Sequence, residues 1–271
     1  MARYKQMSDI DLKNWSEWDD LITDSLWILG KRKNNGTHRG DYWGNFVPQI
    51  PYQAMRRFTQ RGELVIDPFM GSGTTLIEAM RLGRYAIGVD LQEMLVEQVC
   101  QRLASAPNPH KVQAIALSGD STSVQTVRAV QEQMAGLGFT HAHLLIFHPP
   151  YHDVIRFSER AEDLSNAPSL EAFLESLQTT VSLYAPLLGQ GRFLVLVIGD
   201  KYVKGEWVPL GFYAMERIRQ LGFRLKSLCV KDIQENRGKR GQYRLWRYRA
   251  LKHNFYVFKH EYILFFQKQE G

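Results

Sequence analysis

The sequence contains little that would point to an exported or membrane protein. Only two cysteines, Cys100 and Cys229, occur in 271 residues, and neither has a CxxC partner. This excludes a disulfide framework and a cysteine-based zinc site, and no metal is expected. No apolar run approaches the roughly 18 residues of a membrane span, and the N-terminus lacks the apolar core of a signal peptide. These absences indicate a soluble, cytoplasmic protein.

The chain carries an excess of basic residues in an otherwise ordinary composition. Its formal net charge is +6. A polyanion is therefore a favoured partner, because Lys and Arg that neutralise phosphates release counterions. The hydrophobic fraction of 44% and the charged fraction of 23% exclude wholesale disorder. We expect residues 1–271 to form a single domain, with 1–36 as an N-terminal extension.

Short apolar runs alternate with longer amphipathic ones along most of the chain. The runs predicted as strands are nearly continuous in apolar residues, as in strands covered on both faces: 63–67, 85–90, 113–117, 144–147 and 193–198. Helices are predicted at 74–82, 92–104, 123–134, 170–188 and 211–221. This alternation predicts a doubly wound α/β sheet. Two further β-rich runs, 223–231 and 255–267, are expected to pair antiparallel at one sheet edge.

The first predicted strand ends in a glycine-rich turn. In ELVIDPFMGSGTTLIEAMRLGR, Gly71 and Gly73 separate that strand from a helix beginning near Thr74, and glycines let the backbone approach a ligand closely. The next strand ends at Asp90, about 20 residues further on, where a ribose-binding carboxylate belongs. This pair indicates a nucleoside cofactor. Leu76 stands where a dinucleotide fingerprint needs its third glycine, which disfavours a nicotinamide cofactor.

The turn DPFMGSGTT resembles the cofactor motif of the bacterial DNA amino-methyltransferases, which methylate N4 of cytosine or N6 of adenine. The resemblance implies S-adenosylmethionine as cofactor and a Rossmann-like, seven-stranded methyltransferase sheet with an antiparallel edge hairpin. It also implies that Asp90 binds the ribose and Asp120 the adenine amine. Other cofactor-binding residues implied are Asp67, Pro68, Phe69, Gly71, Ser72, Gly73 and Thr74, with Asn45 and Phe46 from the preceding element HRGDYWGNFVPQIPYQAMRRFT.

The fourth predicted strand ends in His148, Pro149, Pro150 and Tyr151. Two prolines cannot continue a central strand, so a rigid loop follows the strand's carboxyl end, where open α/β sheets bind ligands. Methylating a base amine requires a flipped base, acceptors for the amine hydrogens and an aromatic face. The resemblance makes this loop catalytic: His148 and the carbonyl of Pro149 accept the amine hydrogens, and Tyr151 stacks on the base.

His148 departs from the family pattern of Asp, Asn, Ser or Thr at this position. A neutral imidazole can accept a hydrogen bond from an amine, whereas a protonated one cannot. Activity is therefore expected to fall as the pH drops through the histidine's pKa, normally about 6.5. The departure also keeps open a non-catalytic, nucleic-acid-binding relative.

Three segments after the Pro-Pro-Tyr loop resemble the cytosine-N4 branch more closely than the adenine-N6 branch: RFSERAEDLSNAPSLEAFLESL, FLVLVIGDKY and KHEYILFFQK. Cytosine is therefore the favoured base, with adenine N6 and an RNA base amine as alternatives. Neither cysteine follows a proline, so covalent carbon-5 methylation is not expected. The resemblance to restriction-modification enzymes allows a restriction endonuclease as partner, and the sequence makes no prediction of the oligomeric state.

A basic, aromatic insertion at 231–254 separates the last two β-rich runs and begins with Lys231. Interleaved guanidinium and aromatic groups suit a phosphate track with stacking surfaces. We expect double-stranded DNA to lie along this insertion. The residues predicted to contact it are Arg237, Lys239, Arg240, Arg244, Trp246, Arg247 and Arg249.

Overall fold

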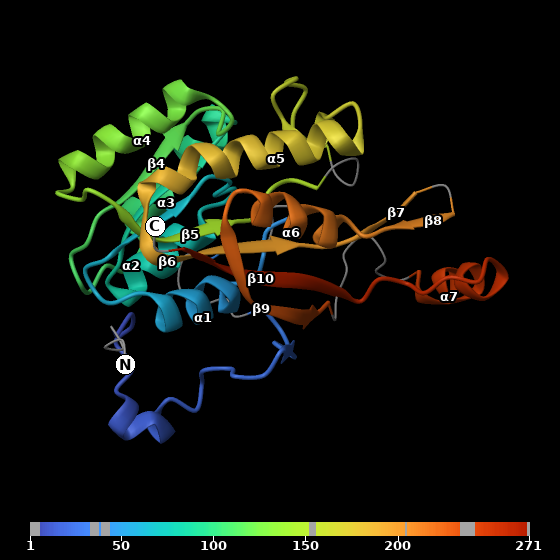
Figure 1. Ribbon diagram of the computed structural model, residues 1–271, viewed down its shortest axis with the longest axis horizontal. Coiled ribbons are helices and arrows are strands. Elements are labelled where there is room, and N and C mark those ends of the chain that lie inside the picture. The colour runs from blue at the N-terminus through green and yellow to red at the C-terminus, as the bar shows by residue number, and fades with distance from the viewer. Residues whose placement is uncertain are drawn as a thin grey trace.

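The computed structural model describes residues 6–32, 38, 44–151, 156–203, 205–233 and 242–269. Within these residues, eight strands form one sheet with helices on both faces (Figure 1). The strands are β1 (Leu26–Trp27), β2 (Leu64–Asp67), β3 (Tyr85–Asp90), β4 (Ala114–Ser118), β5 (Ala142–Phe147), β6 (Leu188–Ile198), β9 (Phe223–Asp232) and β10 (His260–Lys268). The predicted doubly wound α/β sheet is confirmed, with eight strands in place of the seven expected, because β1 pairs with β9.

Two hydrophobic cores, one on each face of the sheet, account for the apolar runs. One core packs α4 (Val124–Gly136), α5 (Leu170–Tyr184) and α6 (Leu210–Gln220) against the sheet. The other packs α1 (Gln49–Phe58), α2 (Thr74–Leu82) and α3 (Glu93–Ser105). Successive residues of β2 alternate between the two cores and all four are buried, so the strand needs no polar face.

The strand order is β1-β9-β10-β6-β5-β2-β3-β4. The segment from β6 to β4 is parallel, so β6, β5, β2 and β3 end at one edge, which we call the carboxyl edge. Strand β10 pairs antiparallel with both β6 and β9, so it begins at this edge and β9 ends there. The β9–β10 pair is therefore antiparallel as predicted. The pair is not the outermost pair of strands in the sheet, because β1 pairs with the outer side of β9.

The sequence patterns missed four elements and misplaced the bounds of two others. Helix α1, strand β1 and the hairpin of β7 (Lys201–Val203) and β8 (Glu206–Val208) were not predicted. The helix predicted over 170–188 ends at Tyr184, because a short 3-10 turn containing Pro186 follows and Leu188 already begins β6. The run 255–267 becomes a strand only at His260, since the preceding aromatics pack against the β7–β8 hairpin.

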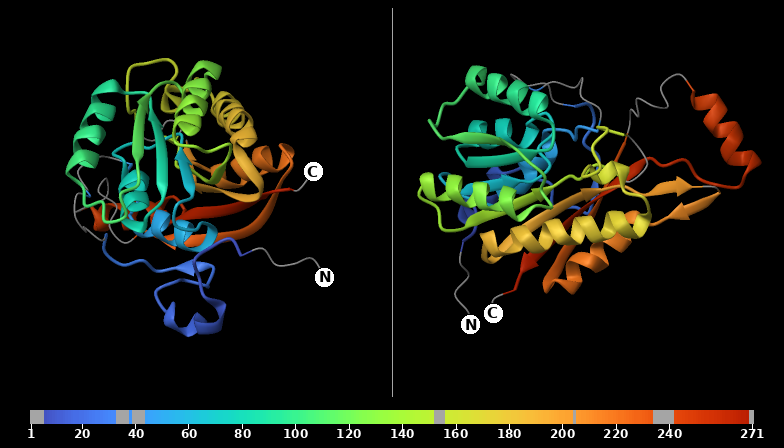
Figure 2. Two further views of the ribbon diagram at one scale, coloured as in Figure 1. Left: turned by 90° about the vertical axis from the view of Figure 1, so that its left-hand side faces the viewer. Right: turned by 90° about the horizontal axis from the view of Figure 1, so that it is seen from above.

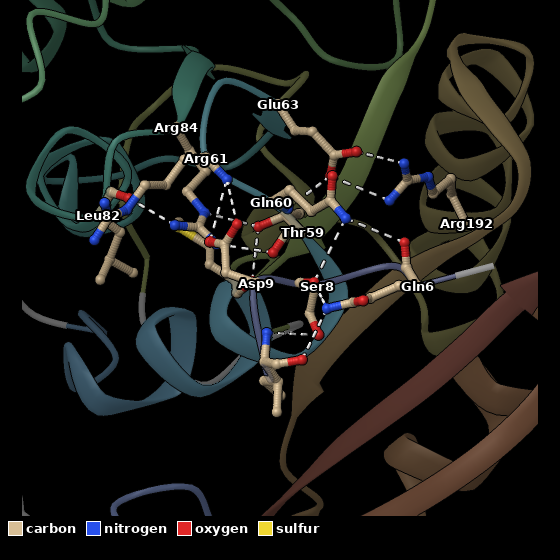
Figure 3. A network of polar contacts seen from close by, with 12 residues as sticks. Gln6, Ser8, Asp9, Thr59, Gln60, Arg61, Glu63, Leu82, Arg84 and Arg192 are labelled. Atoms are coloured by element: carbon tan, nitrogen blue, oxygen red, sulfur yellow. Dashed lines mark hydrogen bonds and ion pairs between the residues drawn. The ribbon is translucent and has the colours of Figure 1, made fainter. Parts of the chain in front are cut away.

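The N-terminal segment is held against the amino end of the sheet by a buried arginine (Figure 3). Arg84 is 0% exposed and donates to the Oδ2 of Asp9 at 2.5 Å. Three further guanidinium hydrogens go to the Oγ1 and carbonyl of Thr59 and to the carbonyl of Leu82. Asp9 also accepts from the backbone N–H of Arg61. The extension is thus bonded into the fold on this side.

Replacing the carboxylate of this contact should destabilise the protein. Asp9→Ala leaves a buried guanidinium without its ionic partner, so we expect the free energy of unfolding to fall by about 1.5–3 kcal/mol. Urea denaturation followed by circular dichroism measures this change. Glu17→Ala, at an exposed position of the same N-terminal segment, is the matched control and should stay within about 0.5 kcal/mol of the parent. Equal stability of the two variants would contradict the role of Asp9.

Candidate active site

The polar residues predicted for the site follow neighbouring strands at the carboxyl edge. Asp67 ends β2, Asp90 ends β3 and Asp120 follows β4, whereas His148 follows β5. Since β5, β2, β3 and β4 are adjacent in that order, the structure brings the predicted cofactor and catalytic motifs together. This is the edge at which open α/β sheets bind ligands.

Asp67 shapes the turn between β2 and α2 from within the fold. Its side chain is fully buried, with one oxygen accepting from the backbone N–H of Phe69 at 2.9 Å and the other from the hydroxyl of Thr75 at 2.5 Å. Burial raises the pKa of this carboxyl to about 7, despite both hydrogen bonds. The contacts of Asp67 hold the turn in its conformation.

The two glycines of the turn have different reasons to be glycine. Gly71 has φ +51° and donates its N–H to the Oδ2 of Asp90 at 3.1 Å, which ties the turn to the end of β3. Gly73 has φ +81°, and a Cβ there would lie 2.8 Å from Cγ1 of Val99 on α3. The left-handed conformation and the packing of α3 therefore require Gly73, independently of any ligand.

Asn45 and Phe46 connect the cofactor turn to the catalytic loop. The Asn45 amide donates to the hydroxyl of Ser72 and accepts from that of Thr74, at 2.5 and 2.7 Å. Phe46 is 6% exposed, and its ring packs edge-on against His148 with the centroids 4.9 Å apart. The element before the glycine-rich turn thus contacts both motifs.

The acceptors at the carboxyl edge suit a nucleoside without phosphates. Asp90 accepts from the N–H groups of Gly71 and Gln92, and burial raises its pKa to about 6, so it is ionised at neutral pH. Asp120 accepts from the N–H and hydroxyl of Thr122. Each carboxylate oxygen can accept a further bond, which matches the ribose hydroxyls and adenine amine of S-adenosylmethionine. A pyrophosphate would be repelled by these carboxylates.

In the catalytic loop, Tyr151 lies among His148, Gly199 and Glu261. Its hydroxyl is 3.5 Å from Nε2 of His148 and 3.4 Å from Oε2 of Glu261. A Cβ on Gly199, just after β6, would lie 3.4 Å from the tyrosine ring. Burial and the charge of Glu261 raise the pKa of Tyr151 well above its usual value, so the phenol keeps its hydrogen.

His148 is held in its neutral form. Burial lowers the pKa of the imidazole to about 4, reinforced by the positive charge of Lys231 and opposed by the negative charge of Glu261. The expected loss of activity near pH 6.5 is therefore wrong for this histidine. A neutral imidazole across the physiological range satisfies the requirement for a hydrogen-bond acceptor.

A buried ion pair behind this loop was not predicted from the sequence. Lys231 and Glu261 face each other across β9 and β10, with Nζ and Oε1 2.9 Å apart. Lys231 is 8% exposed and lies on β9, as the predicted run 223–231 has it, so its side chain does not belong to the exposed face of the basic insertion. A charged residue on each of two paired apolar runs was the signal available in the sequence.

The basic insertion contains a helix that projects beyond the sheet. Helix α7 (Tyr243–Lys252) has no buried residue and stands away from the rest of the chain in two views (Figures 1 and 2). Arg244, Arg247 and Arg249 are exposed, and the Arg249 guanidinium lies 5.3 Å from the ring of Trp246. Arg237, Lys239 and Arg240 lie outside the described residues.

Aromatic contacts connect the base of α7 to the carboxyl edge. Tyr202 on β7 packs against Phe255, and Trp207 on β8 against Phe258, with centroids 5.0 and 4.2 Å apart. The indole of Trp207 donates to Asp200, just after β6, at 3.0 Å. The chain enters α7 from the end of β9 and leaves it toward the start of β10. The basic helix is therefore attached at the same edge as the catalytic loop.

Comparison with solved structures defines the class of fold. The chain superposes on TrmN from Thermus thermophilus with a TM-score of 0.50 and 17% identity, covering 82% of this chain and 49% of that one. It superposes on an S-adenosylmethionine-dependent methyltransferase from Methanosarcina mazei with a TM-score of 0.50 and 12% identity, covering 79% and 96%. The fold is that of the S-adenosylmethionine-dependent methyltransferases.

Comparison of sequences points to the DNA methylases. The family described as DNA methylase matches residues 2–101, and an RMKL-like methyltransferase domain matches 54–166. Type II methyltransferase M.MjaII from Methanocaldococcus jannaschii is 38% identical over 96 residues, 32% of this chain and 18% of its own length. M2.DpnII from Streptococcus pneumoniae is 33% identical over 91 residues, 28% and 34% of the two chains. The resemblance to the DNA amino-methyltransferases is confirmed, although the chain spans only about a fifth to a third of these relatives.

Among the residues that the structure describes, no helix is long and apolar enough to cross a membrane. The same part of the chain contains no cluster of three or more His, Cys, Asp or Glu side chains arranged to hold a metal ion.

The neutrality of His148 can be measured without any substrate. Because burial disfavours the charged imidazole, we expect its protonation midpoint near pH 4, and a ring still neutral at pH 5. NMR of protein labelled with ¹⁵N at its 8 histidines, with His148→Gln to assign the signal, gives the titration curve. A midpoint at pH 6 or above would contradict this expectation.

Proposed function

We propose that this protein transfers the methyl group of S-adenosylmethionine to an exocyclic base amine in DNA, with N4 of cytosine as the favoured target. The observation that carries the proposal is the meeting of two motifs at adjacent strand ends. The glycine-rich turn follows β2 and the Pro-Pro-Tyr loop follows its neighbour β5, with Phe46 packed against His148 and Asn45 bonded to the turn. The matches to Type II methyltransferases support DNA as the substrate.

The cofactor, when bound, supplies an electrophilic methyl group on a sulfonium sulfur. Asp90 would accept from the ribose hydroxyls and Asp120 from the adenine amine. His148 and the carbonyl of Pro149 would accept hydrogen bonds from the two hydrogens of the target amine, which turns its lone pair toward the methyl group. In the overall reaction one of these hydrogens leaves the amine as a proton, and the neutral imidazole of His148 would take it and pass it to solvent. The ring of Tyr151 would stack on the flipped base and hold it in the pocket. The low pKa of His148 supports an active enzyme over a non-catalytic relative.

The preference for cytosine rests on two stretches of sequence that resemble the cytosine-N4 branch. One is FLVLVIGDKY, at the end of β6, and the other is the segment after the Pro-Pro-Tyr loop. A carboxylate or amide acceptor is replaced here by an imidazole, which adenine N6 and cytosine N4 could both use. The two products differ in mass and in chromatography, so one experiment tests the reaction and identifies the base.

The experiment incubates the protein with unmethylated genomic DNA and deuterium-methyl-labelled cofactor, then digests the DNA for mass spectrometry of nucleosides. We expect labelled N4-methylcytosine, whereas labelled N6-methyladenine would correct the base only. Tyr151→Ala removes a stack worth about 1–3 kcal/mol and should slow transfer by about 5- to 150-fold.

Tyr213→Ala, which removes an exposed tyrosine from α6, is the control and should keep the parent's rate. Calorimetry with Asp90→Asn tests the cofactor site separately, and loss of cofactor affinity is expected. Label in neither DNA base, or undiminished transfer by Tyr151→Ala, would refute the proposal.

Helix α7 is proposed as the surface that contacts the DNA backbone. Reversing the charges of two of its exposed arginines, Arg244→Glu with Arg247→Glu, should weaken DNA binding. It should also reduce the slope of log affinity against log salt concentration by about 2, since about one counterion is released per phosphate contact. Fluorescence anisotropy at several salt concentrations measures both.

The matched control reverses Arg219 in the last turn of α6 and Arg224 at the start of β9, which are exposed and lie at the opposite, amino end of the sheet. It changes the net charge equally and should leave most of the salt slope intact. Equal slopes for the two double variants would place the DNA on another surface.

A further inference from the structure

The buried pair Lys231–Glu261 has no part in the reaction as derived above, although it lies directly behind the catalytic loop. Both residues are 9% exposed or less, and they are register partners on β9 and β10. Removing two charges from water costs free energy that an apolar pair would not, so a buried ion pair here suggests a role beyond stability. The oxygen of Glu261 that does not face Lys231 is 3.4 Å from the hydroxyl of Tyr151.

The hydroxyl of Tyr151 has one hydrogen and three polar neighbours. The carboxylate of Glu261 can only accept, and its other oxygen already accepts from Nζ of Lys231. The backbone N–H of Gly199 can only donate to the tyrosine oxygen. The phenol therefore donates its hydrogen to Glu261, and its oxygen is left to accept from Nε2 of His148 at 3.5 Å.

This arrangement decides where the hydrogen of the neutral imidazole lies. If the tyrosine oxygen accepts from Nε2, then Nε2 carries the hydrogen and Nδ1 carries the lone pair. Within the described residues, the contact with Tyr151 is the one hydrogen bond of His148. Like the Oδ1 atom of an aspartate or asparagine, Nδ1 is bonded to Cγ. An unprotonated Nδ1 would thus place an acceptor where the family pattern has one.

We propose that Glu261, braced by Lys231, is a positioning residue that acts through Tyr151 to hold His148 in the Nε2–H tautomer, with Nδ1 free to accept from the target amine. The identity of the amine rests on the proposed function, whereas the tautomer is a property of the protein alone. The buried ion pair then has a role that an apolar pair could not fill.

Exchanging the carboxylate for an amide should reverse the direction of the hydrogen bonds. In Glu261→Gln, the ammonium of Lys231 can donate only to the carbonyl oxygen of the amide. The amide NH₂ therefore faces Tyr151 and donates to its hydroxyl oxygen. The phenol then donates to Nε2 of His148, and the hydrogen moves to Nδ1. The acceptor toward the substrate is lost while the shape of the site is kept.

The test is two-bond ¹H–¹⁵N NMR of histidine-labelled protein at pH 7, in which the two tautomers give different nitrogen shifts. We expect His148 in the Nε2–H form in the parent and in the Nδ1–H form in Glu261→Gln, with methyl transfer at least tenfold slower. Glu63→Gln is the matched control, because Glu63 is also a largely buried partner of a cation, Arg192, but precedes β2 at the amino end of the sheet. It should leave the tautomer and the rate unchanged.

An Nδ1–H form in the parent, or an unchanged tautomer in Glu261→Gln, would overturn the proposal. Should Glu261→Gln fail to fold, Tyr151→Phe replaces it. Loss of the hydroxyl should then convert His148 from one tautomer to a mixture, and a single Nε2–H form there would also overturn the proposal. The expected tautomers in a protein without methyl transfer would support this assignment and refute only the proposed function.

Discussion

Removal of water from the carboxyl edge of the sheet is the constraint on which the site depends. Burial disfavours charge in acids and bases alike, and it acts here in both directions. It raises the pKa of Asp67 to about 7 and of Asp90 to about 6, and lowers that of His148 to about 4. The outcome is a neutral imidazole after β5 and an ionised carboxylate at the end of β3. Both groups can therefore accept hydrogen bonds at neutral pH.

The regular α/β part of the fold could be predicted because local patterns determine it. The range of α2 and that of β3 agree with the sequence prediction to the residue, since a glycine-rich turn, a buried strand and terminal carboxylates are all local signals. The motifs at Asp67 and His148 were found for the same reason. The parallel order of the strands then brought them together without further information.

What the sequence did not reveal depends on contacts between distant segments. Strand β1 has only two residues and forms by pairing with the outer side of β9. Helix α1 begins after Pro48 and has no side-chain cap that a sequence pattern could reveal. The partner of Lys231 stands 30 residues away, across the whole insertion. Gly73 was interpreted as letting the backbone approach a ligand, and the sequence did not show that a Cβ there would also lie 2.8 Å from Cγ1 of Val99 on α3. Each of these features requires tertiary packing to be seen.

The pairing of β1 with β9 has a consequence for how the molecule assembles. Leu29 donates its backbone N–H to Asp232, a residue 203 positions further along the chain. Closing so long a loop is entropically costly and is rewarded only when both ends are ordered, so contacts of this kind form late and slow folding. During synthesis, the segment around Trp27 must wait until nearly all of the described chain has left the ribosome. Until β1 and β9 pair, the side chain of Trp27 and the outer backbone edge of β9 stay exposed to solvent. The protein is therefore open to aggregation at this step of folding.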